Sequence, residues 1–244
     1  MTETAVVMAA GKGTRMKSDL PKVCHVAAGR PLVCWVVDAC RQAGIERVVA
    51  IVGYQQEKVR AALDGMGVEF AVQEQQLGTG HAALQARGVL GEAETRLFVL
   101  NGDAPLIDAT TLAAMRERHL ADSAQMTLTS TIPPQPLEYG RVIRGADGFV
   151  VNVIEERDCT PEQAAIRELN VGFYVFDAPG VWPVLESLGS TNAAGEYYIT
   201  DMARAYSQRG GRVTAVEVPE VVGRGVNTPE QLAQIDGLLR SRGA

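Results

Sequence analysis

Residues 5–22 read AVVMAAGKGTRMKSDLPK, and this stretch decides the fold. The apolar run at its start predicts a buried strand, and a glycine-rich turn follows directly. Gly11 and Gly13 let backbone N–H groups approach an anion closely, because no Cβ stands in the way. Arg15 and Lys22 add cationic donors, and a guanidinium can hold phosphate oxygens through two parallel bonds. The stretch therefore predicts a strand that ends in a polyphosphate-binding loop.

Two common phosphate-binding motifs do not fit this stretch. The P-loop requires G-x-x-x-x-G-K-[ST], whereas here Gly11-Lys12 is followed by Gly13, and Val6 stands at the place of the first glycine. The dinucleotide-binding fingerprint requires a third glycine where this chain has Met16. Because many turns need glycine only for its backbone freedom, specificity depends on the Thr-Arg-Met and Pro-Lys segments that follow.

The composition is that of an ordinary globular protein. Of the 244 residues, 46% are apolar, which argues against disorder. The net charge of −6 is opposite to that of a nucleic-acid-binding surface. No segment approaches the roughly 20 consecutive apolar residues of a membrane span, and the start of the chain lacks a signal-peptide pattern. We therefore expect a cytoplasmic protein with neither nucleic-acid nor membrane partners.

The cysteines and histidines form no recognisable metal-binding or nucleophilic pattern. The cysteines lack C-x-x-C spacing, and the histidines are scattered along the chain. Zinc binding and triad-type hydrolysis are therefore not expected. The residues concerned are Cys24, Cys34, Cys40, Cys159, His25, His81 and His119.

Helical and strand-like segments alternate through the first half of the chain. Apolar spacing predicts helices over 31–44, 55–65 and 81–90, and strands over 47–53, 68–73 and 96–103. Such alternation predicts parallel βαβ units with right-handed crossovers. Ligands of such sheets lie beyond the carboxyl ends of the strands. We therefore expect the 10–16 loop, Gln73 and Asp103 to meet at one edge of the molecule.

The second half is richer in strands. The pattern predicts strands over 124–132, 168–176 and 212–219, a hairpin over 141–156, and helices over 179–188, 196–210 and 228–241. Thr228 is a candidate N-cap of the last helix, with Pro229 at its first position. No long linker or repeat interrupts the chain, so one domain is expected, with parts at about 1–122, 123–227 and 228–241.

Three polar segments have both a structural and a functional interpretation. Asp103 follows a strand, where it could be a turn residue or a ligand of Mg²⁺, which prefers oxygen ligands. Asn227 precedes a helix, where it could cap the helix or offer an amide oxygen to the same metal. Gln73 and Gln76 lie in a polar loop, and their amides could also read the donor and acceptor pattern of a pyrimidine.

The motif A-A-G-x-G-T-R-M, followed by x-L-P-K, resembles the signature of the sugar-phosphate nucleotidyltransferases. The Leu-Gly-Thr-Gly-His-Ala, Gly-Val-Asn and Tyr-Tyr-Ile-Thr-Asp segments are also similar to segments of that family, and in its order. The resemblance covers residues 6 to about 239 and is strongest for uridylyltransferases that make UDP-N-acetylglucosamine. It implies an α/β fold of Rossmann-like, three-layer αβα type, with a mostly parallel mixed sheet and a β-rich sugar-binding insertion.

The same resemblance implies the activity and the site. The activity would be uridylyl transfer from UTP to N-acetylglucosamine-1-phosphate, releasing UDP-N-acetylglucosamine and pyrophosphate, with Mg²⁺ as cofactor. The implied nucleotide-binding residues are Ala9, Ala10, Gly11, Gly13, Thr14, Arg15, Lys22, Gln73, Gln76, Gly78, Thr79 and Gly102. The implied sugar-binding residues are Gly140, Glu155, Asn170 and Thr200. The implied metal ligands are Asp103 and Asn227. The implied catalytic residues are Arg15, Lys22 and Asp103. The nucleotide-binding half would be about 1–122 and the sugar-binding half about 123–227.

Two residues depart from the family pattern. Asn101 stands where an aromatic residue is common, and Val171 replaces a common threonine. Alternatives remain a different sugar-1-phosphate or NTP, a cytidylyl- or guanylyltransferase for non-sugar substrates, and a sugar-nucleotide-binding regulatory module without turnover. Acetyl-transferring relatives carry hexapeptide repeats, and residues 1–244 contain none. This is expected either of a single-function relative or of a shortened chain. The sequence leaves the oligomeric state open.

Overall fold

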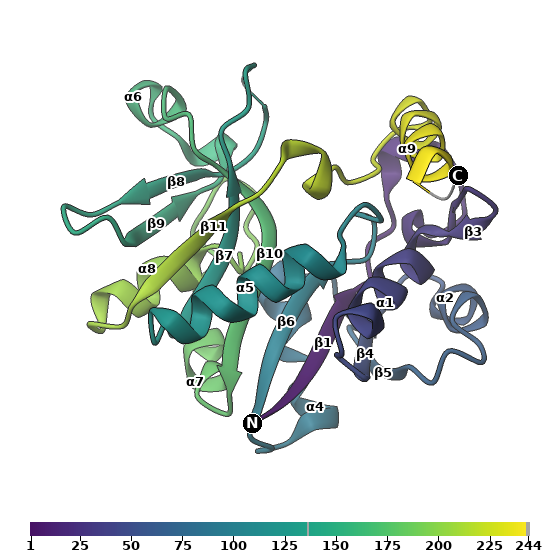
Figure 1. Ribbon diagram of the computed structural model, residues 1–244, viewed down its shortest axis with the longest axis horizontal. Helices are drawn as coiled ribbons and strands as arrows, with labels where there is room; N and C mark the ends of the chain where they lie inside the picture. The colour runs from purple at the N-terminus through teal and green to yellow at the C-terminus, as the bar shows by residue number, and fades with distance from the viewer. Residues whose placement is uncertain (136, 243–244) are drawn as a thin grey trace.

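A mixed β-sheet flanked by helices runs through the molecule in this computed structural model, which describes residues 1–135 and 137–242 (Figure 1). The strands of this sheet are β1 (Thr2–Met8), β4 (Arg47–Val52), β5 (Glu69–Val72), β6 (Thr95–Asn101), β7 (Met126–Thr131), β8 (Arg141–Arg144), β9 (Val150–Ile154), β10 (Leu169–Ala178) and β11 (Val213–Glu217), and β2 (Val26–Ala27) and β3 (Arg30–Pro31) form a separate antiparallel pair. The α-helices are α1 (Leu32–Gln42), α2 (Gln56–Ala62), α3 (Thr79–Leu84), α4 (Arg87–Leu90), α5 (Ala109–Ala121), α6 (Pro161–Ala164), α7 (Val181–Glu186), α8 (Asp201–Gln208) and α9 (Pro229–Arg242).

The main sheet has the strand order β11-β7-β10-β6-β1-β4-β5. β1 lies at the centre of the parallel part, where Val6 pairs with Val49 of β4 on one side and Val99 of β6 on the other. β10 is antiparallel to both β6 and β7, whereas β11 is parallel to β7. The β8–β9 hairpin extends from the start of β10, through pairing of Arg141 with Leu169. The predicted mostly parallel mixed sheet is confirmed.

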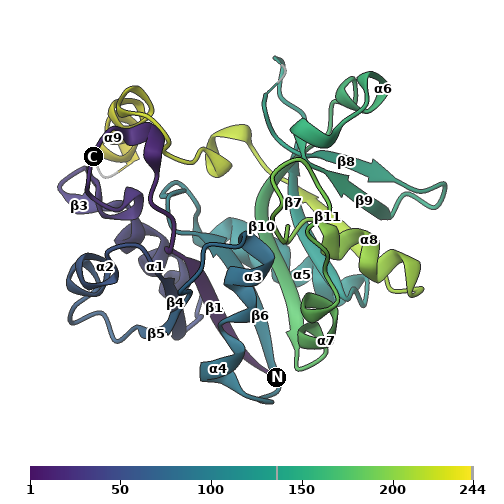
Figure 2. The same ribbon diagram turned by 180° about the vertical axis from the view of Figure 1, so that it is seen from behind.

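Helices cover both faces of the sheet, giving three layers. α1, α2 and α5 contribute to one core, and α3, α4, α7 and α8 to the other (Figures 1 and 2). Successive side chains of a strand point to opposite faces, so β1 sends Ala5 and Val7 into one core and Val6 into the other. This two-sided burial explains the continuous apolar runs in the sequence.

The last helix returns to the loop that follows β1 (Figure 1). Ile235 and Leu239 of α9 share a small core with Met16 and Leu32. The carboxylate of Asp236 also accepts a hydrogen bond from the Ala28 N–H at 2.8 Å. This packing carries the segment before α9 to the carboxyl end of β1.

The structure differs from the sequence prediction at three helices. The helix expected over 81–90 is two short ones, α3 and α4, and the helix expected over 196–210 begins only at Asp201. The first breaks because the Gln85 side-chain amide donates to the His81 carbonyl, while the Gln85 N–H donates to Ala82 instead. The second is delayed because tertiary hydrogen bonds occupy the preceding backbone: the Tyr197 N–H donates to the Leu77 carbonyl at 2.8 Å.

The third difference is α5, a helix that the sequence pattern did not predict. Asp108 caps it by accepting the Thr111 N–H at 2.8 Å. Its inward positions include Leu112, Met115 and the 2% exposed His119. A polar residue at a core position obscures the apolar period, so only the aspartate cap signalled this helix.

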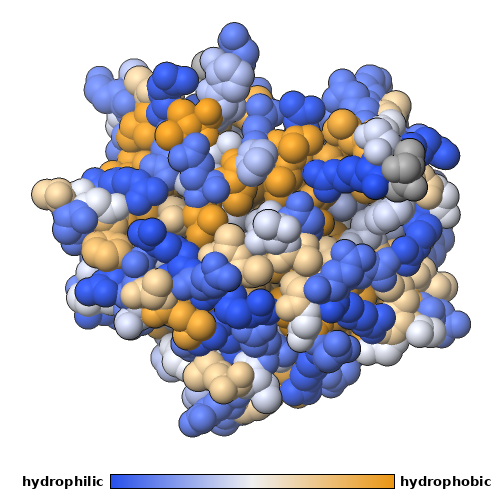
Figure 3. Space-filling view, in the orientation of Figure 1, coloured by the Kyte–Doolittle hydropathy of each residue, from blue (hydrophilic) through white to orange (hydrophobic). Residues whose placement is uncertain are grey.

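One face of the surface combines hydrophilic and hydrophobic regions. Hydrophilic residues occupy much of the rim of the face in Figure 3, with hydrophobic residues gathered nearer its upper centre. Within residues 1–135 and 137–242, no helix has the length and apolar character needed to cross a bilayer.

Candidate active site

A cleft of about 370 Å³ lies where β1 and β6 end. Met8 and Asn101, the last residues of these neighbouring strands, are register partners and both line it. The residues predicted for the site that line it include Gly11, Lys22, Gln73, Gln76 and Asp103. The expected meeting of the glycine loop, the Gln73 segment and Asp103 at one edge of the sheet is observed.

The glycine loop fixes the stem of Lys22. Gly13 has a φ of +69°, in the left-handed region, and a Cβ on it would lie 2.6 Å from the Lys22 Cβ. The loop then closes into a short turn, in which the Met16 N–H donates to the Gly13 carbonyl at 3.0 Å. Glycine at position 13 is therefore needed both for the turn and for the position of the lysine.

Gly13→Ala should lower the free energy of unfolding by about 2 kcal/mol, because it combines a left-handed alanine with a steric clash. Gly11→Ala is the matched control, since no atom lies within 4 Å of a Cβ at that position. It should change stability by less than about 0.5 kcal/mol. Urea unfolding of the two variants measures the difference, and equal stabilities would contradict this account of Gly13.

Four side chains from three distant segments meet at one end of the cleft. Lys22 Nζ forms an ion pair with Asp103 Oδ2 and donates to Asn227 Oδ1 at 2.9 Å. Arg15 Nη2 donates to the same Asn227 oxygen at 3.0 Å. The backbone reinforces this arrangement, because the Val226 N–H donates to the Asp103 carbonyl at 2.9 Å.

The oxygens of Asp103 and Asn227 fit a divalent cation that also binds phosphate. A carboxylate and an amide oxygen, both within reach of one ammonium group, are ligands that hard cations prefer. Within the described part of the chain, no group of three or more His, Cys, Asp or Glu side chains could hold a metal ion. The donor set therefore suits Mg²⁺ bound through one or two protein groups, with phosphates and water completing its shell.

The loop that begins at Gln73 is held largely by its own side chains. Gln73 is 3% exposed, and its Nε2 donates to the Gly78 carbonyl at 3.1 Å and lies 3.0 Å from His81 Nδ1. Thr79 Oγ1 accepts the Ile199 N–H at 3.0 Å. Gln76 is exposed, and its Nε2 donates to the Gln73 carbonyl at 3.2 Å. Gln73 and Thr79 thus shape the loop, and Gln76 has the more accessible amide.

The remaining predicted nucleotide-binding residues are mostly backbone positions around β1. The Ala9 N–H donates to the Ile51 carbonyl at 2.9 Å, and the Ala10 carbonyl accepts the Tyr54 N–H at 3.1 Å. Gly102 packs closely, since a Cβ there would lie 3.0 Å from the Met8 carbonyl oxygen. Thr14 is exposed at the start of the short turn that contains Arg15.

Gly53 and Glu196 lie beside the cleft and were not assigned to the site from the sequence. Gly53 follows β4 at the same edge, and a Cβ there would lie 2.8 Å from Gln76 Nε2 and 2.9 Å from the Gln73 carbonyl oxygen. Glu196 lines the cleft from the second half of the chain. The glycine at the end of an apolar strand was a usable signal for Gly53, and Glu196 directly precedes the Tyr-Tyr-Ile-Thr-Asp segment.

The four predicted sugar-binding residues form a second cluster. Thr200 Oγ1 donates to Glu155 Oε1 at 2.9 Å, and the Asn170 N–H donates to the Gly140 carbonyl at 2.8 Å. A Cβ on Gly140 would lie 3.7 Å from Glu155 Oε2. The β8–β9 hairpin, β10 and the start of α8 therefore deliver these groups to one place.

Two contacts connect this cluster with the cleft. Asn101 Nδ2 donates to the Gly172 carbonyl at 3.2 Å, two residues beyond Asn170. On the other side, Thr79 accepts the N–H of Ile199, the residue before Thr200. The nucleotide loop and the sugar cluster are thus neighbours in space.

Burial raises the pKa of Glu155 above its ordinary value, as do Asp158 and Asp201, whereas the Thr200 hydrogen bond opposes the rise. Folded protein therefore holds this proton more tightly than the unfolded chain. The free energy of unfolding should fall as pH rises from the unfolded pKa through the folded one, by at most about 1.4 kcal/mol per pH unit. Chemical denaturation of Glu155→Gln across that window should show a flatter dependence.

The exposed Glu57 supplies the control, because Glu57→Gln should leave the pH dependence unchanged. Identical pH profiles for Glu155→Gln and the wild type would show that the folded environment does not perturb Glu155.

The MobA-like NTP transferase domain model matches residues 5–146 of this chain. Curated relatives match almost all of it. The protein "Bifunctional protein GlmU" of Geobacter metallireducens is 45% identical over 240 residues, covering 98% of this chain and 50% of the relative. Its namesake in Pelotomaculum thermopropionicum is 42% identical over 243 residues, covering 99% and 53%. The chain thus spans about half the length of these relatives.

Solved structures of UDP-glucose pyrophosphorylase share the fold. The complex with UDP-glucose has a TM-score of 0.78 at 18% identity, over 99% of this chain and 100% of the other. The apo enzyme has a TM-score of 0.79 at 18% identity, over 100% of both chains. At this identity the likeness concerns the α/β nucleotidyltransferase fold alone. Because the domain model covers most of β1, the glycine loop and Asp103 and extends over more than half of the sequence, the chain belongs to the family of MobA-like NTP transferase domains.

Proposed function

We propose that the chain transfers a uridylyl group from UTP to N-acetylglucosamine-1-phosphate and releases UDP-N-acetylglucosamine and pyrophosphate. The observation that carries the proposal is the meeting of Arg15, Lys22, Asp103 and Asn227 at one end of the cleft. The family supplies the reaction class, and the sequence motifs supply the base and the sugar.

The reaction requires positioning more than proton transfer. An oxygen of the sugar phosphate, already anionic, attacks the α-phosphorus of UTP, and the bond from that phosphorus to the leaving pyrophosphate oxygen breaks. Holding both anions in line contributes about 7–11 kcal/mol to lowering the barrier of such reactions. In this proposal the loop amides and Arg15 hold the triphosphate, and Lys22 neutralises charge at the α-phosphate.

Asp103 and Asn227 would hold Mg²⁺, which supplies charge neutralisation and orientation of the phosphate oxygens when bound. In the structure, Lys22 Nζ contacts Asp103 Oδ2 and Asn227 Oδ1. The ammonium group would therefore compete with a bound cation for these two oxygens, and the α-phosphate would be another anion within its chemistry. The glycine loop holds the lysine stem in place because Gly13 packs on its Cβ.

The second cluster would select the sugar. Glu155 offers carboxylate oxygens to sugar hydroxyl groups, and Asn170 offers both a donor and an acceptor. Thr200 orients Glu155 through its hydroxyl group, and Gly140 leaves room beside the carboxylate. The division of the chain into nucleotide-binding and sugar-binding halves is part of the same proposal, and the cytoplasmic location stays a prediction.

A pyrophosphate-release assay tests the proposal. The purified chain is given UTP, CTP, GTP or ATP with N-acetylglucosamine-1-phosphate or glucose-1-phosphate, with and without Mg²⁺. We expect the highest kcat/KM for UTP with N-acetylglucosamine-1-phosphate, and no turnover without the metal. Preference for another pair would overturn the substrate assignment. Binding of UDP-N-acetylglucosamine without any pyrophosphate release would indicate a regulatory module instead.

A further inference from the structure

Strand β10 contains an irregularity between the sugar cluster and the cleft. Its register against β7 shifts between Asn170 and Tyr174. Gly172, in the middle of the shifted segment, has a φ of +93°. Bulges of this kind turn side chains in new directions and are common next to active sites. Here the bulge determines where Asn170 points.

The bulge fixes which way round the Asn170 amide lies. The Gly172 N–H can only donate, and it donates to Asn170 Oδ1 at 3.3 Å. The amide nitrogen therefore faces the other way, where Nδ2 donates to the Tyr174 hydroxyl oxygen at 2.8 Å. One hydrogen of Nδ2 and one lone pair of Oδ1 remain available for a ligand.

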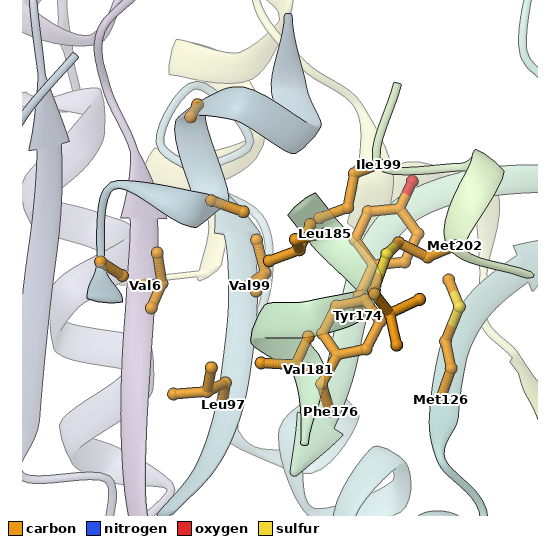
Figure 4. Close-up of a cluster of buried hydrophobic side chains, with 14 of the residues drawn as sticks. Val6, Leu97, Val99, Met126, Tyr174, Phe176, Val181, Leu185, Ile199 and Met202 are labelled. Atoms are coloured by element: carbon orange, nitrogen blue, oxygen red, sulfur yellow. The ribbon is translucent and has the colours of Figure 1, made fainter. Parts of the chain in front are cut away.

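The hydroxyl group of Tyr174 lies at the edge of an apolar core. Tyr174 is 2% exposed, and its ring stacks on Phe176 with centroids 6.1 Å apart. Figure 4 shows the hydroxyl oxygen at the Ile199 end of this cluster, away from Phe176. Burial and the Glu155 carboxylate raise the pKa of Tyr174, so the hydroxyl group stays neutral. A buried neutral hydroxyl group needs a hydrogen-bond partner, and Asn170 is that partner.

The structure assigns to Tyr174 the part of a positioning residue for the sugar phosphate: its hydroxyl group holds the Asn170 amide in the orientation that a sugar ligand requires. This assignment rests on the proposed function. Asn101 supports the bulge from the cleft side through the Gly172 carbonyl. Because rigid support reduces the ordering that a ligand must impose on binding, its loss should weaken sugar binding specifically.

Tyr174→Phe tests the assignment, because it removes the hydroxyl group and keeps the ring. We expect the KM for the sugar phosphate to rise about fivefold to tenfold, as for loss of one hydrogen bond, with kcat and the KM for UTP within about twofold of wild type. Tyr206→Phe is the matched control. Tyr206 is another buried tyrosine, and its ring also stacks on Phe176, with centroids 6.3 Å apart. It should leave all three constants unchanged.

A double-mutant cycle with Asn170→Ala decides whether Tyr174 acts through Asn170. In the Asn170→Ala background, Tyr174→Phe should have no further effect on the sugar-phosphate KM. Additive effects, an equal rise in the KM for UTP, or an unchanged sugar-phosphate KM in Tyr174→Phe would overturn the assignment. If the wild type prefers a different sugar phosphate, the substrate proposal fails and the cycle is run with the preferred one.

The side-chain amide of Asn170 gives a readout that needs no turnover. In ¹⁵N-labelled protein, Tyr174→Phe should shift the Asn170 Hδ2 signals and speed their exchange with solvent, whereas Tyr206→Phe should not. If no pyrophosphate is released from any substrate pair, this spectrum still tests the positioning of Asn170. Unchanged Asn170 signals would then refute it.

Discussion

Asp103→Ala should lower kcat by about 10³-fold or more while the protein stays folded, because metal-assisted charge stabilisation is worth several kcal/mol. Asp103 brings the carboxylate to the meeting point of Arg15, Lys22 and Asn227, and its side chain is 14% exposed. Its removal takes away the charged ligand proposed for Mg²⁺ and leaves only the neutral amide of Asn227. The pyrophosphate-release assay with saturating Mg²⁺ measures the effect.

Two further measurements make this prediction specific. Mn²⁺ binding followed by electron paramagnetic resonance should be lost in Asp103→Ala, and circular dichroism should stay that of the wild type. Asp64 is an exposed aspartate outside the cleft, so Asp64→Ala serves as the control and should retain activity. Near-normal turnover of Asp103→Ala with Mg²⁺ would remove Asp103 from the proposed metal site.

Lys22→Met should lower kcat by about 10²-fold to 10³-fold, comparable with the loss of one preorganised donor in a catalytic site. Methionine keeps most of the stem that Gly13 packs against and removes the ammonium group. Because the charge is proposed to act at the α-phosphate as the new bond forms, the KM for UTP should change much less than kcat. The opposite pattern would assign Lys22 to binding of the ground state alone.

The same variant should bind Mn²⁺ alone about tenfold more tightly than wild type, a gain of ~1.4 kcal/mol. The reason is competition, since Lys22 Nζ contacts the Asp103 and Asn227 oxygens that the cation would need. Lys12→Met provides a control of equal charge, because the exposed Lys12 ammonium lies over the Tyr54 ring at 5.3 Å. Equal Mn²⁺ affinity in the Lys12 and Lys22 variants would show that the tighter binding comes from the loss of one positive charge and not from competition for the Asp103 and Asn227 oxygens.

Much of the fold followed from local patterns. The apolar run before Gly11 predicted β1, and the alternation of apolar strands and helices predicted the parallel half of the sheet. Prediction failed where tertiary contacts overrode local preference. Tyr197 lies in a segment with a helical pattern, but its N–H donates to the Leu77 carbonyl instead of forming a helical hydrogen bond. In α5, the buried His119 interrupts the apolar pattern, so the segment was not recognised as a helix.

The site shows the same division. Gln73 was a candidate for reading a base, yet its amide nitrogen is engaged by the Gly78 carbonyl within its own loop. Gly53 and Glu196 were missed because their proximity to the cleft depends on how β4 and the segment before α8 are packed. A residue type can be recognised along the chain, but its free hydrogen-bonding capacity is known only from its neighbours.

The sequence by itself determined the strand and glycine loop at residues 5–22 and, through its motifs, the class of chemistry. It could do so because a tight turn and a cationic loop are set by adjacent residues. Only the tertiary structure decided that Lys22 holds Asp103 and Asn227 together, and that Tyr174 orients Asn170 across a bulge. The physical reason is that the contact between Lys22 and Asn227, and the bulge of β10, arise from packing of elements far apart in the chain, which no local pattern encodes.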